Sequence, residues 1–232
     1  VPNEGPHGEG ESDNKLQYSG DLFAEESLKF VRDHQHERFF LYLAVTAPHA
    51  NNEAKVHGME VPDLGEYADK DWPEPRKGQA AMVTRLDTQV GQLLELLTEL
   101  KLDKKTLVIF TSDNGPDKEA GYTPEMNDSN GPLRGLKRDL TECGIRVPFI
   151  ARWPGKIAAG TTSNAVCYSA DMLPTLAAIG HATPRKGLDG VNLIPTLHGQ
   201  NQPELQDRYL YWEFHVRGGF HQAARRGKWK AI

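Results

Sequence analysis

The sequence predicts an α/β fold in which helices flank a mostly parallel sheet. The first observation is an alternation along the chain: segments with helical periodicity are followed by short apolar segments, an order typical of α/β domains. The second is that apolar and polar residues do not alternate within two apolar segments, 39–45 and 106–111. Such continuous runs indicate strands that are buried on both faces, as in a parallel sheet.

The chain opens with a predicted loop over residues 1–18, which are rich in glycine, proline and polar residues. A helix is predicted to begin at Asp21, a residue type that often caps helices. Four residues recur at spacings that share one face of this helix: Phe23, Phe30, Val31 and His34. The buried strand 39–45 follows, and the polar, proline-rich segment 50–78 predicts a long loop of the kind that is often functional.

The middle of the chain has the strongest helical pattern. A helix over residues 79–100 is predicted from an apolar stripe at spacings of three and four: Val83, Leu86, Val90, Leu93, Leu97 and Leu100. The buried strand 106–111 follows, and then a polar segment, 112–146, with little apolar periodicity. A short third strand is predicted over 147–151, near the end or edge of a sheet because it contains Pro148.

The C-terminal part predicts two helices and a hairpin. The helices cover residues 171–179 and 192–198, and the first has an aspartate at its start. Arg226-Gly227, between segments 222–225 and 228–232, indicates the turn of a β-hairpin. Because the sequence ends inside the second of these strands and begins with valine, we expect a fragment at both ends.

The composition is that of an ordinary globular protein. Hydrophobic residues make up 38% and charged residues 25% of the 232 residues, and the net charge is −5. The absence of a basic block argues against a nucleic-acid partner, and no apolar run is long enough to span a membrane. The two cysteines, Cys143 and Cys167, form no CxxC pair, which argues against a thiolate metal site. The sequence allows two alternatives for these cysteines: two buried thiols, or one disulfide between them.

Candidate functional residues stand just beyond the carboxyl ends of the two buried strands, where parallel sheets bind ligands. His49 follows the first strand, and Asp113 and Asn114 follow the second. The two oxygen-bearing side chains suit calcium or magnesium, and Gly115-Pro116 supplies a turn that lets both reach one ion. Taken alone, this tetrapeptide also fits an ordinary turn, and His49 also fits a surface histidine.

A third candidate element is the cationic segment 133–148, which carries Arg134, Lys137, Arg138 and Arg146. If it faces a metal site at the strand ends, it would attract an anion with a tetrahedral group. Taken alone, it fits a solvated charged loop equally well.

Together these segments resemble the sulfatase family of the alkaline phosphatase superfamily. The resemblance runs from about Asp21 to the end and rests on seven motifs in the family's order, which together are specific. The motifs are Phe39-Phe40-Leu41-Tyr42-Leu43 with Pro48-His49, Met82-Val83-x-Arg85-Leu86-Asp87, Thr111-Ser112-Asp113-Asn114-Gly115-Pro116, Arg134-Gly135-x-Lys137, Gly144-Ile145-Arg146-Val147-Pro148-Phe149-Ile150 with Trp153-Pro154-Gly155, Asp171-Met172-x-Pro174-Thr175-Leu176, and Leu188-Asp189-Gly190-Val191 ahead of Pro195-Thr196-Leu197.

The resemblance implies a partial alkaline-phosphatase-like α/β fold. Residues 1–200 would be the C-terminal part of the catalytic domain, and residues 201–232 would begin a small C-terminal subdomain. It also implies a sulfuric ester hydrolase that uses Ca²⁺ and acts on a sulfated small molecule or glycan, with a carbohydrate or aryl substrate. Because sulfatases of this type are usually exported, the parent protein would be secreted, periplasmic or lysosomal.

The resemblance also implies roles for six residues. Asp113 and Asn114 would be calcium ligands. His49 and Lys137 would contact the sulfate group, with His49 near the leaving oxygen. Substrate contacts are implied for a further pair: Glu213 and His215.

The nucleophile of the family is expected outside this sequence. Sulfatases of this type use a formylglycine made from a Cys/Ser-x-Pro/Ala-x-Arg motif, and neither cysteine nor any serine of this sequence begins one. The Asp-Asp pair that completes the family's calcium site is missing too, as are a further lysine and histidine. We therefore expect a fragment that lacks the N-terminal half and is inactive by itself.

Two other functions stay open. A phosphodiesterase or phosphonate hydrolase of the same superfamily would share the fold, although the surroundings of Trp153-Pro154-Gly155 and Asp189-Gly190 favour a sulfatase. A non-catalytic binding protein that keeps the fold is the second alternative. An intact Cys-x-Pro-x-Arg motif upstream in the parent gene would argue against it, and a metal titration would test it.

Overall fold

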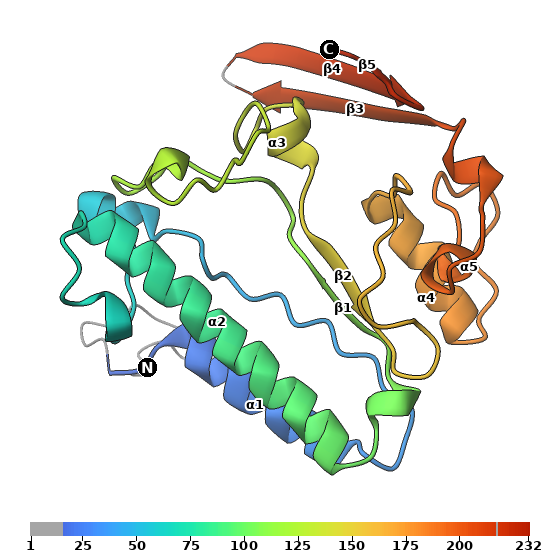
Figure 1. Ribbon diagram of the computed structural model, residues 1–232, viewed down its shortest axis with the longest axis horizontal. Coiled ribbons are helices and arrows are strands. Elements are labelled where there is room, and N and C mark those ends of the chain that lie inside the picture. The colour runs from blue at the N-terminus through green and yellow to red at the C-terminus, as the bar shows by residue number, and fades with distance from the viewer. Residues whose placement is uncertain (1–15, 217) are drawn as a thin grey trace, which may run out of the picture. The chain divides into compact units, whose positions relative to one another are not determined.

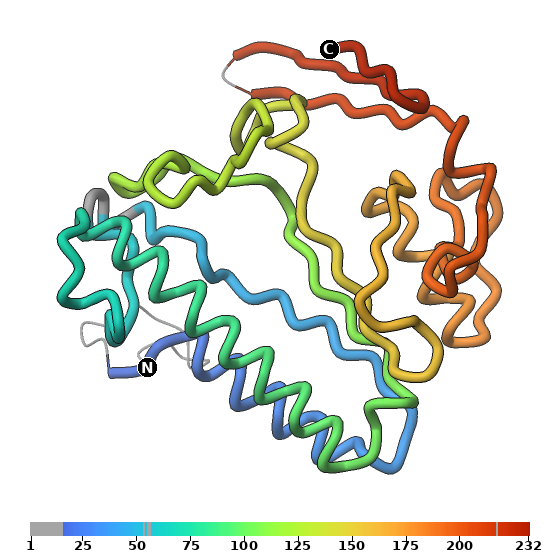
Figure 2. The backbone as a smooth tube through the Cα atoms, in the orientation of Figure 1, coloured from blue at the N-terminus to red at the C-terminus, as the bar shows by residue number. Residues whose placement is uncertain are grey.

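The computed structural model describes residues 16–216 and 218–232, whose elements form two compact units (Figures 1 and 2). Of the described residues, the first unit contains those up to Asp103 together with Pro116–Gly131, and the second contains Lys104–Gly115 and those from Pro132 onward. Most of the loop predicted for residues 1–18 lies outside the described residues. The domain boundary expected at residue 200 stays a prediction. Among the described residues, no helix combines the length and apolarity that crossing a bilayer requires.

Two long helices, α1 (Ser19–Asp33) and α2 (Glu74–Glu99), lie side by side in the first unit (Figure 1). The predicted apolar face of α1 is confirmed in part. Val31 is buried, and Phe30 and His34 are half-buried with their ring centroids 4.3 Å apart, but Phe23 is exposed. The residues that α1 buries are small or β-branched and recur at helical spacing: Gly20, Ala24, Ser27 and Val31. Small side chains let two helix backbones approach closely, which an aromatic face would prevent.

Asp21 lies in the first turn of α1 rather than at its N-cap, which is Tyr18. Its carboxylate accepts two hydrogen bonds of 2.6 Å from the guanidinium of Arg85, on α2, and a third of 3.0 Å from Gln89. The predicted cap therefore serves as a link between the two helices. This two-pronged geometry is the strong form of an arginine–carboxylate contact.

Helix α2 begins at Glu74, five residues before the predicted start, and follows Pro73 with Pro75 in its first turn. The prolines led to the prediction of a loop, yet proline is favoured at helix starts because the first amides have no partner inside the helix. The remainder of the predicted loop contains two short 3₁₀ turns, Asn52–His57 and Gly65–Tyr67. Segment 116–131, with a 3₁₀ turn at Pro124–Met126, is joined to α2 through hydrogen bonds of Asn127 to Arg76 (3.0 Å) and Gln79 (2.7 Å).

Residues 39–45, predicted to be a buried strand, belong to no strand of the described structure. The segment pairs with no described strand, and Figure 2 shows it as an unbroken path without helical turns. Phe40 and Tyr42 are 68% and 81% exposed, so it is not buried on both faces. The apolar run was identified correctly, but a strand needs neighbouring strands to satisfy its backbone hydrogen bonds, and local sequence cannot supply them.

The second unit contains strands β1 (Val108–Thr111) and β2 (Phe149–Arg152), close to the predicted positions. They pair antiparallel, from Val108 opposite Arg152 to Thr111 opposite Phe149. The helices α3 (Glu142–Ile145), α4 (Met172–Ile179) and α5 (Ile194–Leu197) belong to the same unit, and the last two match predicted helices. All pairings among the described strands are antiparallel, so the parallel part of the predicted sheet is not within this part of the chain.

A three-stranded antiparallel sheet ends the second unit (Figure 1). Its strands are β3 (Tyr209–Val216), β4 (Gly219–Arg226) and β5 (Trp229–Ala231). The hairpin predicted at Arg226-Gly227 is confirmed, because Arg226 pairs with Trp229 across that turn. Strand β3 was not predicted.

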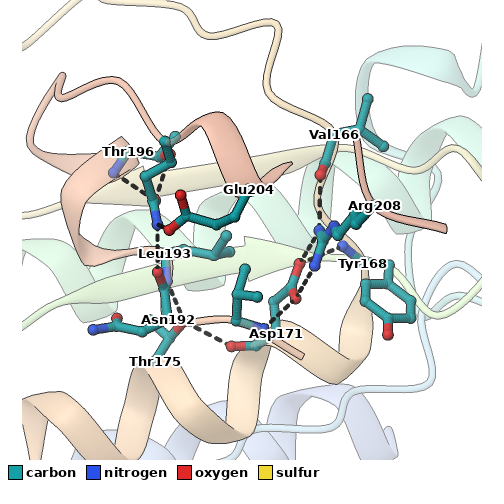
Figure 3. A network of polar contacts seen from close by, with 11 residues as sticks. Val166, Tyr168, Asp171, Thr175, Asn192, Leu193, Thr196, Glu204 and Arg208 are labelled. Atoms are coloured by element: carbon teal, nitrogen blue, oxygen red, sulfur yellow. Dashed lines mark hydrogen bonds and ion pairs between the residues drawn. The ribbon is translucent and has the colours of Figure 1, made fainter. Parts of the chain in front are cut away.

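A buried ion pair anchors β3 to the start of α4 (Figure 3). Asp171 is fully buried, and Arg208 donates to its two carboxylate oxygens at 2.6 and 2.7 Å. The backbone amides of Tyr168 and Val191 donate to the same oxygens at 3.0 and 2.9 Å, and Arg208 also donates to the carbonyl of Val166 at 2.8 Å. Burying a charge is tolerable only with such complete pairing.

Cys143 and Cys167 are not joined in a disulfide, which settles the alternative left open by the sequence. Burial raises the pKa of Cys143, and burial together with the nearby Asp171 carboxylate raises the pKa of Cys167. We expect both thiols to react with DTNB at pH 8 more slowly in the folded chain than in urea, because the thiolate is the reactive form. Equal rates in the two conditions would contradict this.

Candidate active site

The Asp113-Asn114 turn directly follows β1 and is held by its own backbone. The amide of Gly115 donates to the carbonyl of Gly144 at 3.0 Å, and Ser112 Oγ donates to the carbonyl of Asn114 at 3.0 Å. Any side chain at position 115 would run into the carbonyl of Cys143, so a glycine is required there. The Gly115-Pro116 turn expected from the sequence is therefore present and packs against α3.

The donor types at this turn fit a hard divalent cation. Asp113 is exposed, and Asn114 is half-buried. Asn114 uses its side-chain nitrogen to donate to the carbonyl of Gly115 at 3.2 Å, which leaves its side-chain oxygen as the atom to face an ion. Calcium takes about six to eight oxygen ligands, so these two side chains would form only part of its coordination shell.

Lys137 sits in a tight loop that is also fastened to α3. The amide of Cys143 donates to the carbonyl of Arg134 at 2.9 Å, and the Asp139 carboxylate accepts from the amide of Leu136 at 2.9 Å. Gly135, with φ 101°, occupies a conformation that favours glycine. Lys137 is half-buried, whereas the neighbouring Arg138 is exposed.

Asp113, Asn114 and Lys137 thus all belong to the second unit, in two loops that share one short helix as support. Glu213 and His215 belong to the same unit and project from one face of β3, where both are exposed. Glu213 accepts a 2.9 Å hydrogen bond from the hydroxyl of Tyr211, and the ring of His215 packs on Phe220. Their predicted substrate contacts stay a prediction.

His49 belongs to the first unit and follows a cis peptide bond between Ala47 and Pro48. Its Nδ1 lies 2.7 Å from the carbonyl of Ala50. Because a carbonyl only accepts, Nδ1 carries the proton in this contact, and Nε2 is the ring atom that remains for chemistry.

Two acidic residues near His49 were missed by the sequence analysis. Nε2 of His49 lies 3.7 Å from a carboxylate oxygen of Glu119. A group of three side chains could hold a metal ion, because one ligand atom from each lies within 4.8 Å of the other two: His49, Asp117 and Glu119. The only sequence signal was a pair of carboxylates shortly after Gly115-Pro116, and its proximity to His49 arises from folding.

Family models identify the chain. Residues 3–182 match the model described as Sulfatase, and residues 136–230 match the model described as N-sulphoglucosamine sulphohydrolase, C-terminal. The chain belongs to the sulfatase family. The resemblance inferred from its motifs is therefore confirmed.

Curated relatives agree with this assignment. The chain is 36% identical over 213 residues to the N-acetylgalactosamine-6-sulfatase of Homo sapiens, covering 90% of this chain and 37% of the relative. It is 36% identical over 200 residues to the arylsulfatase A of Homo sapiens, covering 85% of this chain and 36% of the relative. This sulfatase chain thus spans little more than a third of the length of these relatives.

Solved structures confirm the fold class. The structure of Ps i-CgsB in complex with k-i-k-neocarrahexaose has a TM-score of 0.77 at 31% identity, over 95% of this chain and 47% of that chain. The PsFucS1 sulfatase from Pseudoalteromonas sp. has a TM-score of 0.64 at 25% identity, over 91% of this chain and 40% of that chain. The sulfatase chain therefore has the predicted alkaline-phosphatase-like α/β fold.

Proposed function

We propose that this sulfatase chain supplies calcium ligands and sulfate-binding residues to an enzyme that hydrolyses sulfate monoesters of a carbohydrate or aryl alcohol. The observation that carries the proposal is the joint support of the Asp113-Asn114 turn and the Lys137 loop by α3. It places hard oxygen donors and a half-buried cation in one unit of a sulfatase-family fold, and a sulfate ester needs both kinds of partner.

Each of these residues has a distinct chemical task. Asp113 and Asn114 would hold Ca²⁺, which when bound neutralises negative charge on sulfate oxygens. Lys137 binds a sulfate oxygen and stabilises the charge that develops as the ester bond breaks. His49 is proposed to lie near the leaving oxygen and, in its doubly protonated form, to give that oxygen a proton from Nε2, while its Nδ1–H donates to the carbonyl of Ala50 and orients the ring.

The remaining assignments follow from the family. The nucleophile, a formylglycine in sulfatases of this type, is expected outside this sequence, and Glu213 and His215 are proposed to contact the substrate. One relative is an N-acetylgalactosamine-6-sulfatase, and one similar structure is in complex with k-i-k-neocarrahexaose, which favours a sulfated glycan as substrate. A secreted, periplasmic or lysosomal location is proposed on the same grounds.

A phosphonate hydrolase is the second candidate. The phosphonate monoester hydrolase of Agrobacterium radiobacter has a TM-score of 0.50 at 24% identity, over 69% of this chain and 34% of that chain, which shows a shared fold alone. The higher identity to sulfatases, 36% in two curated relatives, favours sulfate over phosphonate esters.

The test compares the 232-residue chain with the full-length protein, each with calcium and with EDTA. We expect hydrolysis of a chromogenic aryl sulfate and of a sulfated sugar by the full-length protein with calcium, and none by the chain alone. Turnover by the chain above a mock preparation would show that its nucleophile is present after all. Faster turnover of an aryl phosphonate than of the sulfate esters would favour the second candidate.

A further inference from the structure

A cavity of about 470 Å³ in the second unit shares no lining residue with the candidate active site. It is formed by the segment 163–166, the segment 196–210, and the end of β4 with the turn that joins β4 to β5. This volume falls within the roughly 300–1,000 Å³ typical of sites for small molecules. It exceeds what a single inorganic anion would fill.

The lining of this cavity is basic and rich in amides. Three cations line it, namely Arg208, Arg225 and Lys228, and no aspartate or glutamate is among the described lining residues. Five asparagine and glutamine side chains, one serine and one threonine complete its polar surface. Amide and hydroxyl groups both donate and accept hydrogen bonds, which suits the hydroxyl groups of a sugar.

The positive charge of the lining is only partly compensated. Arg208 is matched by the buried Asp171. Arg225 lies 3.4 Å from Glu142, but that single carboxylate is also approached by Arg146 and Lys230, so three cations share one negative charge. Lys228 is exposed and adds a further positive charge from the turn between β4 and β5. One more carboxylate is linked to the lining: Glu204 accepts a hydrogen bond from the lining residue Gln202.

Arg208 also has one N–H group that donates no hydrogen bond to the described residues. Its two terminal nitrogens bind Asp171 and the carbonyl of Val166, while its Nε is buried and has no hydrogen-bond partner among the described residues. A buried N–H without a partner is unfavourable, and an anionic oxygen bound in the cavity is a suitable acceptor.

We propose that this cavity binds a sulfated sugar unit, as a glycan-binding site outside the hydrolytic residues. Surplus positive charge recognises the sulfate group, and the amide side chains recognise the hydroxyl groups. A sulfated glycan carries such units repeatedly, so a chain held here by one unit would stay near the enzyme after each hydrolytic event. The inference rests on the cavity itself and would stand if the proposed hydrolysis were wrong.

The test titrates the ¹⁵N-labelled 232-residue chain with a sulfated disaccharide, its unsulfated counterpart and sodium sulfate, and follows backbone amides by NMR. We expect saturable shifts at Gln200 and Gly227 with the sulfated disaccharide. Lys228→Gln should weaken this binding by roughly three- to tenfold, since one exposed charge contact is lost. Lys186→Gln, an equal charge change at an exposed residue outside the cavity, should leave the affinity unchanged.

Four outcomes would overturn the proposal. They are equal binding of the unsulfated disaccharide, equal binding of sodium sulfate, equal weakening by both lysine variants, and shifts confined to the loop of Lys137. The last outcome would at the same time support the proposed sulfate site. Saturable shifts at Gln200 without shifts at Lys137 would instead support the cavity site and count against the proposed sulfate site. The two hypotheses can therefore fail separately.

Discussion

Lys137→Ala in the full-length protein is expected to lower kcat/KM for an aryl sulfate by about a hundredfold or more and to leave calcium affinity nearly unchanged. One charge-assisted contact to the transition state is worth on the order of 3 kcal/mol, which corresponds to that factor. Lys137 lies in its own loop, fastened to α3 through backbone hydrogen bonds, so its loss does not remove a proposed calcium ligand. Steady-state kinetics beside calorimetric calcium titration measures both quantities.

Neighbouring residues provide matched comparisons. Arg138→Ala removes an equal charge at the next position, where the side chain is exposed, and is expected to be nearly neutral. Asp113→Ala should weaken calcium binding and turnover together, and Asn114→Ala should do so more mildly because it removes a neutral ligand. His49→Ala should resemble Lys137→Ala and also change the pH profile. Full activity of Lys137→Ala, or unchanged calcium affinity of Asp113→Ala, would show these site assignments to be wrong.

Arg208→Ala is expected to lower the free energy of unfolding of the chain by about 3–5 kcal/mol, the usual cost of leaving a buried charge without its partner. Asp171 is fully buried, and without Arg208 its carboxylate keeps only the amides of Tyr168 and Val191. The hydrogen bonds that Arg208 donates to Asp171 also raise the pKa of Arg208 above its ordinary value, so the arginine stays charged. Urea unfolding followed by circular dichroism measures the change.

Arg226→Ala is the matched control for this experiment. Arg226 makes the same two-pronged contact with Asp207, at 2.7 and 2.8 Å, but both side chains are exposed. Water and salt screen such a pair, so its loss should change the stability little. If the two arginine variants unfold at the same urea concentration, burial of the Asp171 pair is not what stabilises the second unit.

The sequence could predict the elements whose signals are local. The apolar runs at β1 and β2 and the turn at Arg226-Gly227 each encode their structure within a few residues. The segment 39–45 carried an equally strong apolar run, yet no described strand pairs with it. Strand formation depends on distant partners, whereas a turn depends on its own residues.

The candidate site also combines features that are local in the sequence with features that arise only from the fold. The motif at Asp113-Asn114 could be recognised because its residues are consecutive and end in a turn. The approach of Glu119 to His49 joins residues 70 positions apart, and no periodicity predicts it. The pairing of Asp171 with Arg208 spans 37 positions and is equally invisible without the fold.

The shared support of the Asp113-Asn114 turn and the Lys137 loop by α3 has a consequence for how this region tolerates change. The links from Gly115 to Gly144 and from Arg134 to Cys143 use backbone atoms, so most side chains along this stretch can vary without altering them. The glycines are exceptions. A methyl group at Gly115 or Gly144 would strike a neighbouring carbonyl, and Gly135 has a positive φ and the side chain of Thr141 beside it. Chain length is the stricter constraint: inserting or deleting one residue between 134 and 144 would displace the Lys137 loop relative to the Asp113-Asn114 turn, whereas many substitutions there would leave both in place.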